Sequence, residues 1–171
     1  MFSCCAWAGT THDDLLLLRA QAAIFPKIIL LDKQLEEKQV NNEIVITIVA
    51  TNYDDRIERQ LQSLIEEKYK NKLGNKKLTI NVTSIDNFNQ DFVATAYIIL
   101  HGSESLFNKV VSHASNNDRI VFSYSYTDFK YNALISLLVK EKTYIYLNKS
   151  AIQLYDIKFS PVFYKITKII E

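Results

Sequence analysis

A histidine, a glycine and a serine directly follow a short apolar run, and of all residues in this chain they are the best placed to do chemistry. Residues 97–100 are continuous, apolar and β-prone, which is typical of a strand buried on both faces. His101, Gly102 and Ser103 end this run, and a helical pattern begins at Glu104. Imidazole changes charge near neutral pH, so His101 could be a general base, a metal ligand or a hydrogen-bonding group.

Catalysis and metal binding both lack the partners that they need. The other histidines are His12 and His113, and no HxxH, HExxH or Cys/His set is present. Ser103 does not lie in a GxSxG motif, and no base is visibly paired with a nucleophile. An enzyme that uses His101 with Ser103 or Asp54 is therefore the least favoured interpretation. We predict no catalytic residue, no metal, no cofactor and no enzyme activity.

A turn histidine that bonds to backbone is the default interpretation of His101, and a binding site is the functional interpretation that the same residues favour over catalysis. Polar residues that follow neighbouring parallel strands meet at one edge of the sheet. Strands are also predicted over 43–50 and 119–125, on the two sides of 97–100. We therefore expect three turns to form a ligand or partner site, namely Thr51, Asn52 and Tyr53; His101, Gly102 and Ser103; and Ser123, Tyr124 and Ser125.

The remaining pattern predicts the elements that position these turns. Helices are expected over 15–25, with a kink or split at Pro26 and a continuation to about residue 38, and then over 55–69 and 104–113. Residues 78–85 alternate in polarity, which is typical of a strand at or near a sheet edge. Residues 133–141 and 143–148 are separated by one residue, which permits only an antiparallel hairpin. A last helix is expected over 161–170.

This order of elements predicts the fold class. We expect one α/β domain with three layers, in which a mostly parallel central sheet is built from βα units. An antiparallel β-hairpin near the C-terminus and a terminal helix complete it. With 171 residues, the chain is large enough for one well-packed domain.

Four consecutive leucines at 15–18 are apolar on every side of one helical turn. Burial in the core is the default interpretation, and the alternative is a surface shared with another protein or a second copy. For that alternative, the candidate surface consists of Leu15, Leu16, Leu18 and Ala22.

A second group of residues that could bind a partner is rich in tyrosine. Tyr can present apolar area with a polar tip, so the cluster could be a recognition surface, and a half-buried sheet face explains it equally well. Both interpretations stay open. The cluster consists of Tyr124, Tyr126, Tyr131, Tyr144 and Tyr146.

Composition excludes several classes of function. The net charge is +1 and no basic stripe is present, so a nucleic-acid partner has no electrostatic support. With only 3 glycines, a Gly-rich phosphate loop is absent. Cys4 and Cys5 are the only cysteines, so no internal disulfide framework is expected. No window approaches the ~18 continuous apolar residues of a transmembrane helix.

The first eight residues end in an A-x-A pattern, Ala6-Trp7-Ala8, of the kind that signal peptidase recognises. We interpret residues 1–8 as the remnant of a secretory signal or as a disordered N-terminus, and residues 9–171 as the domain. An exported protein and an intracellular one with a chance A-x-A are both compatible with this stretch.

The C-terminal third resembles the YfiR-like family of small periplasmic proteins. A strand ending in Asn148 is followed by Lys149-Ser150-Ala151, then by Ile157-Lys158-Phe159-Ser160 and an apolar segment. Family members carry a similar series of strand, Asn, helix and Ser before their last helix. The stretches YIILHGSE and RAQAAIFPKIILLDK look like the family's middle strand-turn-helix and opening helix, so the likeness spans roughly residues 19–170.

The resemblance implies a non-enzymatic periplasmic regulator that acts through protein contacts. The best-studied type represses an inner-membrane diguanylate cyclase by binding its periplasmic part, and thereby controls cyclic-di-GMP and biofilm formation. On this basis the expected partner is the periplasmic part of a membrane cyclase or kinase, with a homodimer as a further option. Related domains serve as sensor inputs, so a small-ligand-binding sensor of a signalling or transport system is the alternative.

Two features depart from the family pattern. Members with structural disulfides have internal cysteines, and this chain has none after Cys5. The glycine pair that often precedes the hairpin is replaced by Tyr131-Asn132. Redox control is therefore not expected here.

Overall fold

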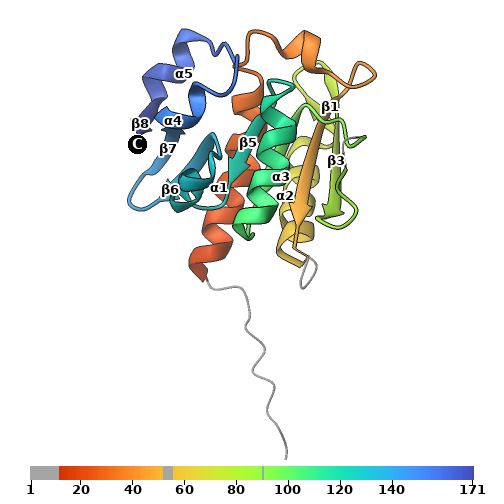
Figure 1. Ribbon diagram of the computed structural model, residues 1–171. Helices are drawn as coiled ribbons and strands as arrows, with labels where there is room; N and C mark the ends of the chain where they lie inside the picture. Colours follow the sequence, from red (N-terminus) through yellow and green to blue (C-terminus); the bar gives the residue numbers. More distant parts are fainter. Residues whose placement is uncertain (1–11, 52–55, 90) are drawn as a thin grey trace, which may run out of the picture.

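The computed structural model describes residues 12–51, 56–89 and 91–171, which form an eight-stranded sheet with helices on both faces (Figure 1). The strand order is β2-β3-β1-β4-β5-β6-β7-β8. The strands are β1 (Ile44–Ala50), β2 (Lys72–Leu73), β3 (Lys76–Ser84), β4 (Ala96–Ile99), β5 (Ile120–Ser123), β6 (Ile135–Val139), β7 (Thr143–Asn148) and β8 (Thr167–Ile170). The helices are α1 (His12–Ile29), η1 (Leu35–Lys38), α2 (Arg56–Tyr69), α3 (Glu104–Ser115), η2 (Tyr126–Tyr131), α4 (Lys149–Ile152) and α5 (Pro161–Ile166).

The centre of the sheet is parallel and buried, as predicted. Strand β4 lies between β1 and β5 and runs parallel to both, with Ile98 beside Ile48 on one side and Phe122 on the other. All residues of β1, β4 and β5 are buried, which explains their continuous apolar sequences. Strand β3, whose polarity alternates, is second from the edge, and on its outer side only the two-residue β2 flanks it.

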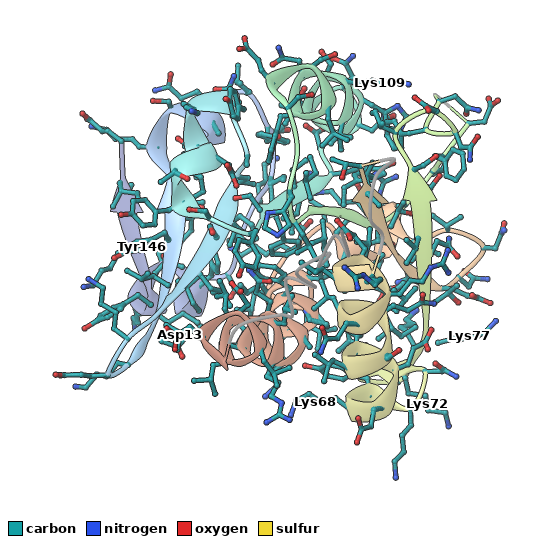
Figure 2. The ribbon with its side chains drawn as sticks, turned by 90° about the horizontal axis from the view of Figure 1, so that it is seen from below. Asp13, Lys68, Lys72, Lys77, Lys109 and Tyr146 are labelled. Carbon is teal, nitrogen blue, oxygen red and sulfur yellow. The ribbon has the colours of Figure 1, made fainter. Side chains whose placement is uncertain are left out.

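The two faces of the sheet are covered by different helices, which Figure 2 shows from below. On one face α1 packs against the sheet, where the Phe25 and Phe122 rings stack with centroids 4.3 Å apart, and α2 lies beside α1. On the other face α3 contributes His113, whose Nε2 lies 3.0 Å from the Tyr97 hydroxyl. The α/β class and its three layers therefore agree with the sequence prediction.

The predicted antiparallel hairpin is present, and the terminal helix begins at Pro161 as predicted but its predicted extension to residue 170 is wrong. Strands β6 and β7 pair antiparallel through a tight turn in which Lys140 N donates to Lys142 O (3.1 Å). The helix that begins at Pro161 ends at Ile166, and residues 167–170 form β8 parallel to β7. This segment is mostly β-branched, and the open edge of β7 satisfies its backbone groups, which favours a strand over more helix.

The first helix also differs from its prediction. We expected a kink or split at Pro26 and a helix resuming to about residue 38, and α1 instead continues through Pro26 and ends at Ile29. Phe25 and Ile28 are core residues on both sides of the proline, so packing compensates for the backbone donor that proline lacks. The chain then pairs with a distant segment, since Lys33 N donates to Lys158 O (2.8 Å) and Ser160 N to Leu31 O (2.8 Å).

The leucine-rich turn of α1 contributes to the core. Leu18 and Ala22 are 0% and 2% exposed, so their assignment to a partner or dimer surface is wrong. They point toward the sheet because the apolar stripe of α1 has to cover one sheet face. Leu15 is half-buried, and Leu16 is 41% exposed. No helix in the described part of the chain combines the length and apolar character that crossing a bilayer requires.

Candidate functional site

The carboxyl ends of the parallel strands form the edge at which we predicted a site. The chain passes from β1 through α2 to β3 on one side, and then returns to β4 on the other side of β1. In doubly wound folds, ligands bind at such a reversal, outside the carboxyl ends of the strands. Figure 2 looks onto this edge and shows Asp13, at the beginning of α1, on the same side of the molecule. Thr51 follows β1 here, while Asn52 and Tyr53 lie outside the described residues.

His101 and Tyr124 come together at this edge. Tyr124 follows β5, and its backbone N–H donates to the Ile99 carbonyl (3.0 Å), which holds it beside the end of β4. The two rings lie with centroids 4.7 Å apart and planes tilted by 47°. His101 is exposed and Tyr124 is half-buried, so the pair forms part of the surface that the edge presents. Sheet topology alone was sufficient to predict this meeting.

Helix α1 contributes two further polar groups, which the sequence did not indicate. The Tyr124 hydroxyl donates to Asp14 Oδ1 (2.5 Å), and Gln21 Nε2 donates to the Tyr124 carbonyl (3.2 Å). Burial together with the Asp14 carboxylate raises the pKa of Tyr124, so the phenol stays protonated as a donor. Gln21 is fully buried, and its Oε1 has no hydrogen-bond partner among the described residues. Residues 14 and 124 are distant in sequence, so no local pattern could reveal the contact.

Two serines that we expected in the site hold the backbone instead. Ser123 is fully buried, and its hydroxyl donates to the Ser125 carbonyl (2.9 Å). The Ser125 hydroxyl caps η2 by accepting from Thr127 N (3.2 Å), while Asp128 accepts from Ser125 N (3.3 Å). This capping box fixes the direction of the chain after β5. Ser123 cannot contact a ligand, so its assignment to the site is wrong.

Gly102 and Ser103 shape the turn between β4 and α3. A Cβ at Gly102 would lie 2.2 Å from Leu106 Cδ2, so any other residue there requires Leu106 to move. Ser103 is the N-cap of α3, and its hydroxyl accepts from Leu106 N (3.3 Å). The Ser103 side chain is thus directed at its own helix.

Two carboxyl groups lie near the His101–Tyr124 pair. Asp14 accepts a hydrogen bond from Tyr124, and Asp128 on η2 is close enough to His101 for the imidazole to lower the pKa of its carboxyl group. Burial raises the pKa of Asp128, and the Ser125 N–H and the charges of His101 and Lys130 partly oppose this rise. The arrangement offers aromatic contact, hydrogen bonding and negative charge. In the described part of the chain, no three His, Cys, Asp or Glu residues gather as metal ligands would.

The tyrosine cluster divides among three places, one of which is the position of Tyr124 beside His101. Tyr144 and Tyr146 share one face of β7, with Tyr126 5.4 Å from Tyr146 and Lys168 Nζ 3.8 Å from the Tyr144 ring centroid. Both strand tyrosines are half-buried, and Figure 2 shows Tyr146 at the side of the sheet away from α2. Tyr131 instead stacks on Phe107 of α3 (5.3 Å). The cluster is therefore not one continuous surface.

The fold and this edge define an open, doubly wound α/β domain with polar turns at its switch point. No family model matches the sequence, and no curated protein does. The fold is similar to the crystal structure of a conserved domain protein from Vibrio cholerae O1 biovar El Tor strain N16961, with 13% identity, a TM-score of 0.60, and coverage of 90% of this chain and 60% of that chain.

A second solved structure with a similar fold carries a ligand. It is an ABC domain in complex with L-Trp from Streptococcus pneumoniae, with 12% identity, a TM-score of 0.56, and coverage of 85% of this chain and 61% of that chain. The present chain thus spans about 60% of the length of both proteins. At these identities the likeness shows a common fold.

Proposed function

We propose that this chain is a non-enzymatic binding domain, a sensor of a signalling or transport system, which receives a small polar ligand at the carboxyl edge of the sheet. The observation that carries the proposal is the meeting of His101, Tyr124 and Asp14 at the topological switch point. Three separate elements supply these side chains. Their phenol, carboxylate and imidazole can orient a ligand, and Ser103 is engaged with its own helix rather than activated by His101.

An amino acid is the class of ligand that this edge fits best. The Asp14 carboxylate and the Tyr124 ring suit a ligand ammonium group, since both attract cations. The first turn of α3, which begins beside His101, presents backbone N–H groups that suit a carboxylate. The similar fold that holds L-Trp supports this class.

Thermal unfolding with each of the twenty amino acids tests the proposal. A ligand that binds only the folded state raises the unfolding midpoint in proportion to ln(1 + [L]/Kd). We expect at least one amino acid to do so, and His101→Ala to weaken its binding at least tenfold by titration calorimetry. Glu141→Ala, in the exposed β6–β7 turn, is the control. No midpoint change with any amino acid, or unchanged affinity in His101→Ala, would refute the proposed ligand site.

A second candidate function rests on a different surface. The resemblance to YfiR-like proteins suggests a periplasmic regulator that binds a membrane diguanylate cyclase or kinase. Supporting it are large apolar side chains of α5 and β8 that lie at the surface: Val162 (56%), Ile166 (50%) and Ile169 (55% exposed).

Affinity capture from detergent-solubilised membranes tests this regulator. We expect recovery of a membrane signalling protein by the wild type and by His101→Ala, and its loss with Ile166→Lys combined with Ile169→Lys. Recovery that the double variant leaves unchanged, or recovery of no signalling protein, contradicts the regulator. Light scattering of the same variants shows whether this surface forms a homodimer instead.

A further inference from the structure

A second concave region lies on the other side of the molecule, along α3. In the connection from β3 to β4, residues 85–89 and 91–95 contain no helix, so no helix packs against this flank of α3. A cleft of about 940 Å³ lies between the flank and the connection. Lys109, which lines the cleft, is seen on α3 in Figure 2. The volume of the cleft is within the range of ligand-binding clefts.

The floor of the cleft is held by a hydrogen-bonded group of aromatic side chains. The Tyr97 hydroxyl donates to the Phe92 carbonyl (2.6 Å), and His113 Nε2 lies 3.2 Å from that carbonyl and 3.0 Å from the hydroxyl oxygen. Because the Tyr97 proton is directed at the carbonyl, His113 Nε2 has to carry a proton and donate. Phe88 packs edge-on against both rings, at 5.8 and 5.5 Å. These contacts hold Phe88 and His113, which line the cleft, in place.

The wall of the cleft is a row of three hydrogen-bonding side chains. Asn108, Ser112 and Asn116 are exposed and lie four residues apart on α3. No hydrogen bond to a described residue engages the side chain of any of the three. Four residues of helix rise about 6 Å. An extended peptide repeats every two residues, at about 6.6–6.8 Å. The row therefore matches the spacing at which one edge of an extended backbone presents its amide groups.

The chemistry of the lining agrees with this geometry. Side-chain amides donate and accept like the peptide group, so they can satisfy N–H and C=O groups alternately. Among the described lining residues are Lys109, His113 and no carboxylate, which disfavours a basic segment. A saccharide would need an aromatic ring face to stack on, and Phe88, the aromatic ring of the lining, is only 1% exposed.

From these observations we infer that the α3 cleft binds an extended, neutral or acidic polypeptide segment of a partner protein. Its backbone lies along α3 and bonds to Asn108, Ser112 and Asn116. This site is separate from the proposed ligand edge, since α3 presents its first turn there and its flank here. Neither site requires the other.

Selection from a random dodecapeptide library displayed on phage, with the wild-type chain as bait, provides the probes. Selected peptides are synthesised with a fluorophore, and their affinities are measured by anisotropy. We expect the Asn108→Leu, Asn116→Leu double variant to bind them at least tenfold more weakly. Asn75→Leu, an exposed asparagine in the β2–β3 turn, should bind as the wild type does. N-methylation of alternate peptide amides should weaken binding similarly, because it removes the backbone donors.

The two replaced side chains are exposed, so we expect the variants to fold as the wild type does. Their unfolding midpoints verify this. Equal affinity of the double variant and the wild type, or tolerance of N-methylation along the whole peptide, would overturn the inference. Binding of maltotriose in competition with the peptides would identify a saccharide cleft instead and also overturn it. His101→Ala should leave peptide affinity unchanged. Failure of the peptide site can therefore be distinguished from failure of the proposed amino-acid site at the sheet edge.

Discussion

The carboxylate of Asp32 and the ammonium of Lys38 form an ion pair of 2.6 Å from which water is almost excluded, with side-chain exposures of 2% and 7%. Asp32 Oδ1 also accepts from Gln34 N (2.9 Å). Asp32 forms an isolated bridge with Phe159. The ion pair therefore secures the place where the end of α1 meets the segment that leads into α5.

Removing one member of this pair should be costly. Lys38→Met leaves the Asp32 carboxylate buried and without its cation, and we expect the free energy of unfolding to fall by about 3–5 kcal/mol. Replacing both, as Asp32→Leu with Lys38→Met, should cost much less because no charge is left buried. Urea unfolding measures both. Lys33→Met, an exposed neighbour, is the control. Equal losses in the single and double variants would contradict the argument.

Asn148 should tolerate almost no replacement. Its amide donates to the carbonyls of Phe129 and Ala133 (both 2.9 Å), and its Oδ1 accepts from Ser150 N (3.0 Å) and Ala151 N (3.2 Å). Asn148→Asp keeps the shape but places a carboxylate oxygen against two carbonyl oxygens. We expect a loss of about 3 kcal/mol or more by urea unfolding. Asn75→Asp, an exposed counterpart, should cost little, and a comparable loss there would count against this account.

The turn at Gly102 predicts a non-additive pair of mutations. Gly102→Ala forces Leu106, which is 2% exposed, out of its packed position, at a cost of about 1–3 kcal/mol. Leu106→Ala alone should also destabilise the domain, by about 2–5 kcal/mol. In the double variant the added methyl occupies space that the Leu106 side chain has vacated. The loss of unfolding free energy in the double variant should therefore be smaller than the sum of the losses in the two single variants. Strict additivity in thermal or urea unfolding would mean that the contact is unimportant.

Alkaline pH should destabilise the fold through its buried phenols. Burial raises the pKa of Tyr97 to about 12 from the ordinary value near 10. The folded state therefore favours the protonated phenol, and this contribution is complete below pH 10 and is lost as pH rises toward 12. Urea unfolding at pH 8, 10 and 11 should show stability falling less steeply in Tyr97→Phe than in the wild type. Tyr164→Phe, on the exposed side of α5, is the control. Parallel pH curves would refute the prediction.

The central sheet was predictable because its signal is local. β1, β4 and β5 are short apolar runs, and their turns carry the polar residues that end them, so burial and direction follow from the sequence. The end of the chain was not predictable in this way. In residues 161–170 the apolar spacing suits a helix, and the open edge of β7, which is a tertiary feature, determines that residues 167–170 pair as a strand.

The candidate site was half predictable for the same reason. Sheet topology brings His101 and Tyr124 together, and this could be inferred from where the strands end. Asp14 and Gln21 could not be inferred, because α1 can cross its sheet face in many directions and only packing selects one. The α3 cleft could not be inferred either, because it depends on a connection between β3 and β4 that contains no helix. Sequence periodicity predicts the helices and strands that form, and it gives no signal for the space that a missing helix leaves.

The contacts of α1 bear on the order in which the chain can fold during synthesis. Tyr124, the hydrogen-bond partner of α1, is more than a hundred residues downstream of Asp14 and Gln21. Helix α1 also packs against β6. Until residue 139 has emerged from the ribosome, the apolar stripe of α1 therefore lacks part of its cover. A chaperone that recognises exposed apolar helices would find a target in α1 during this interval.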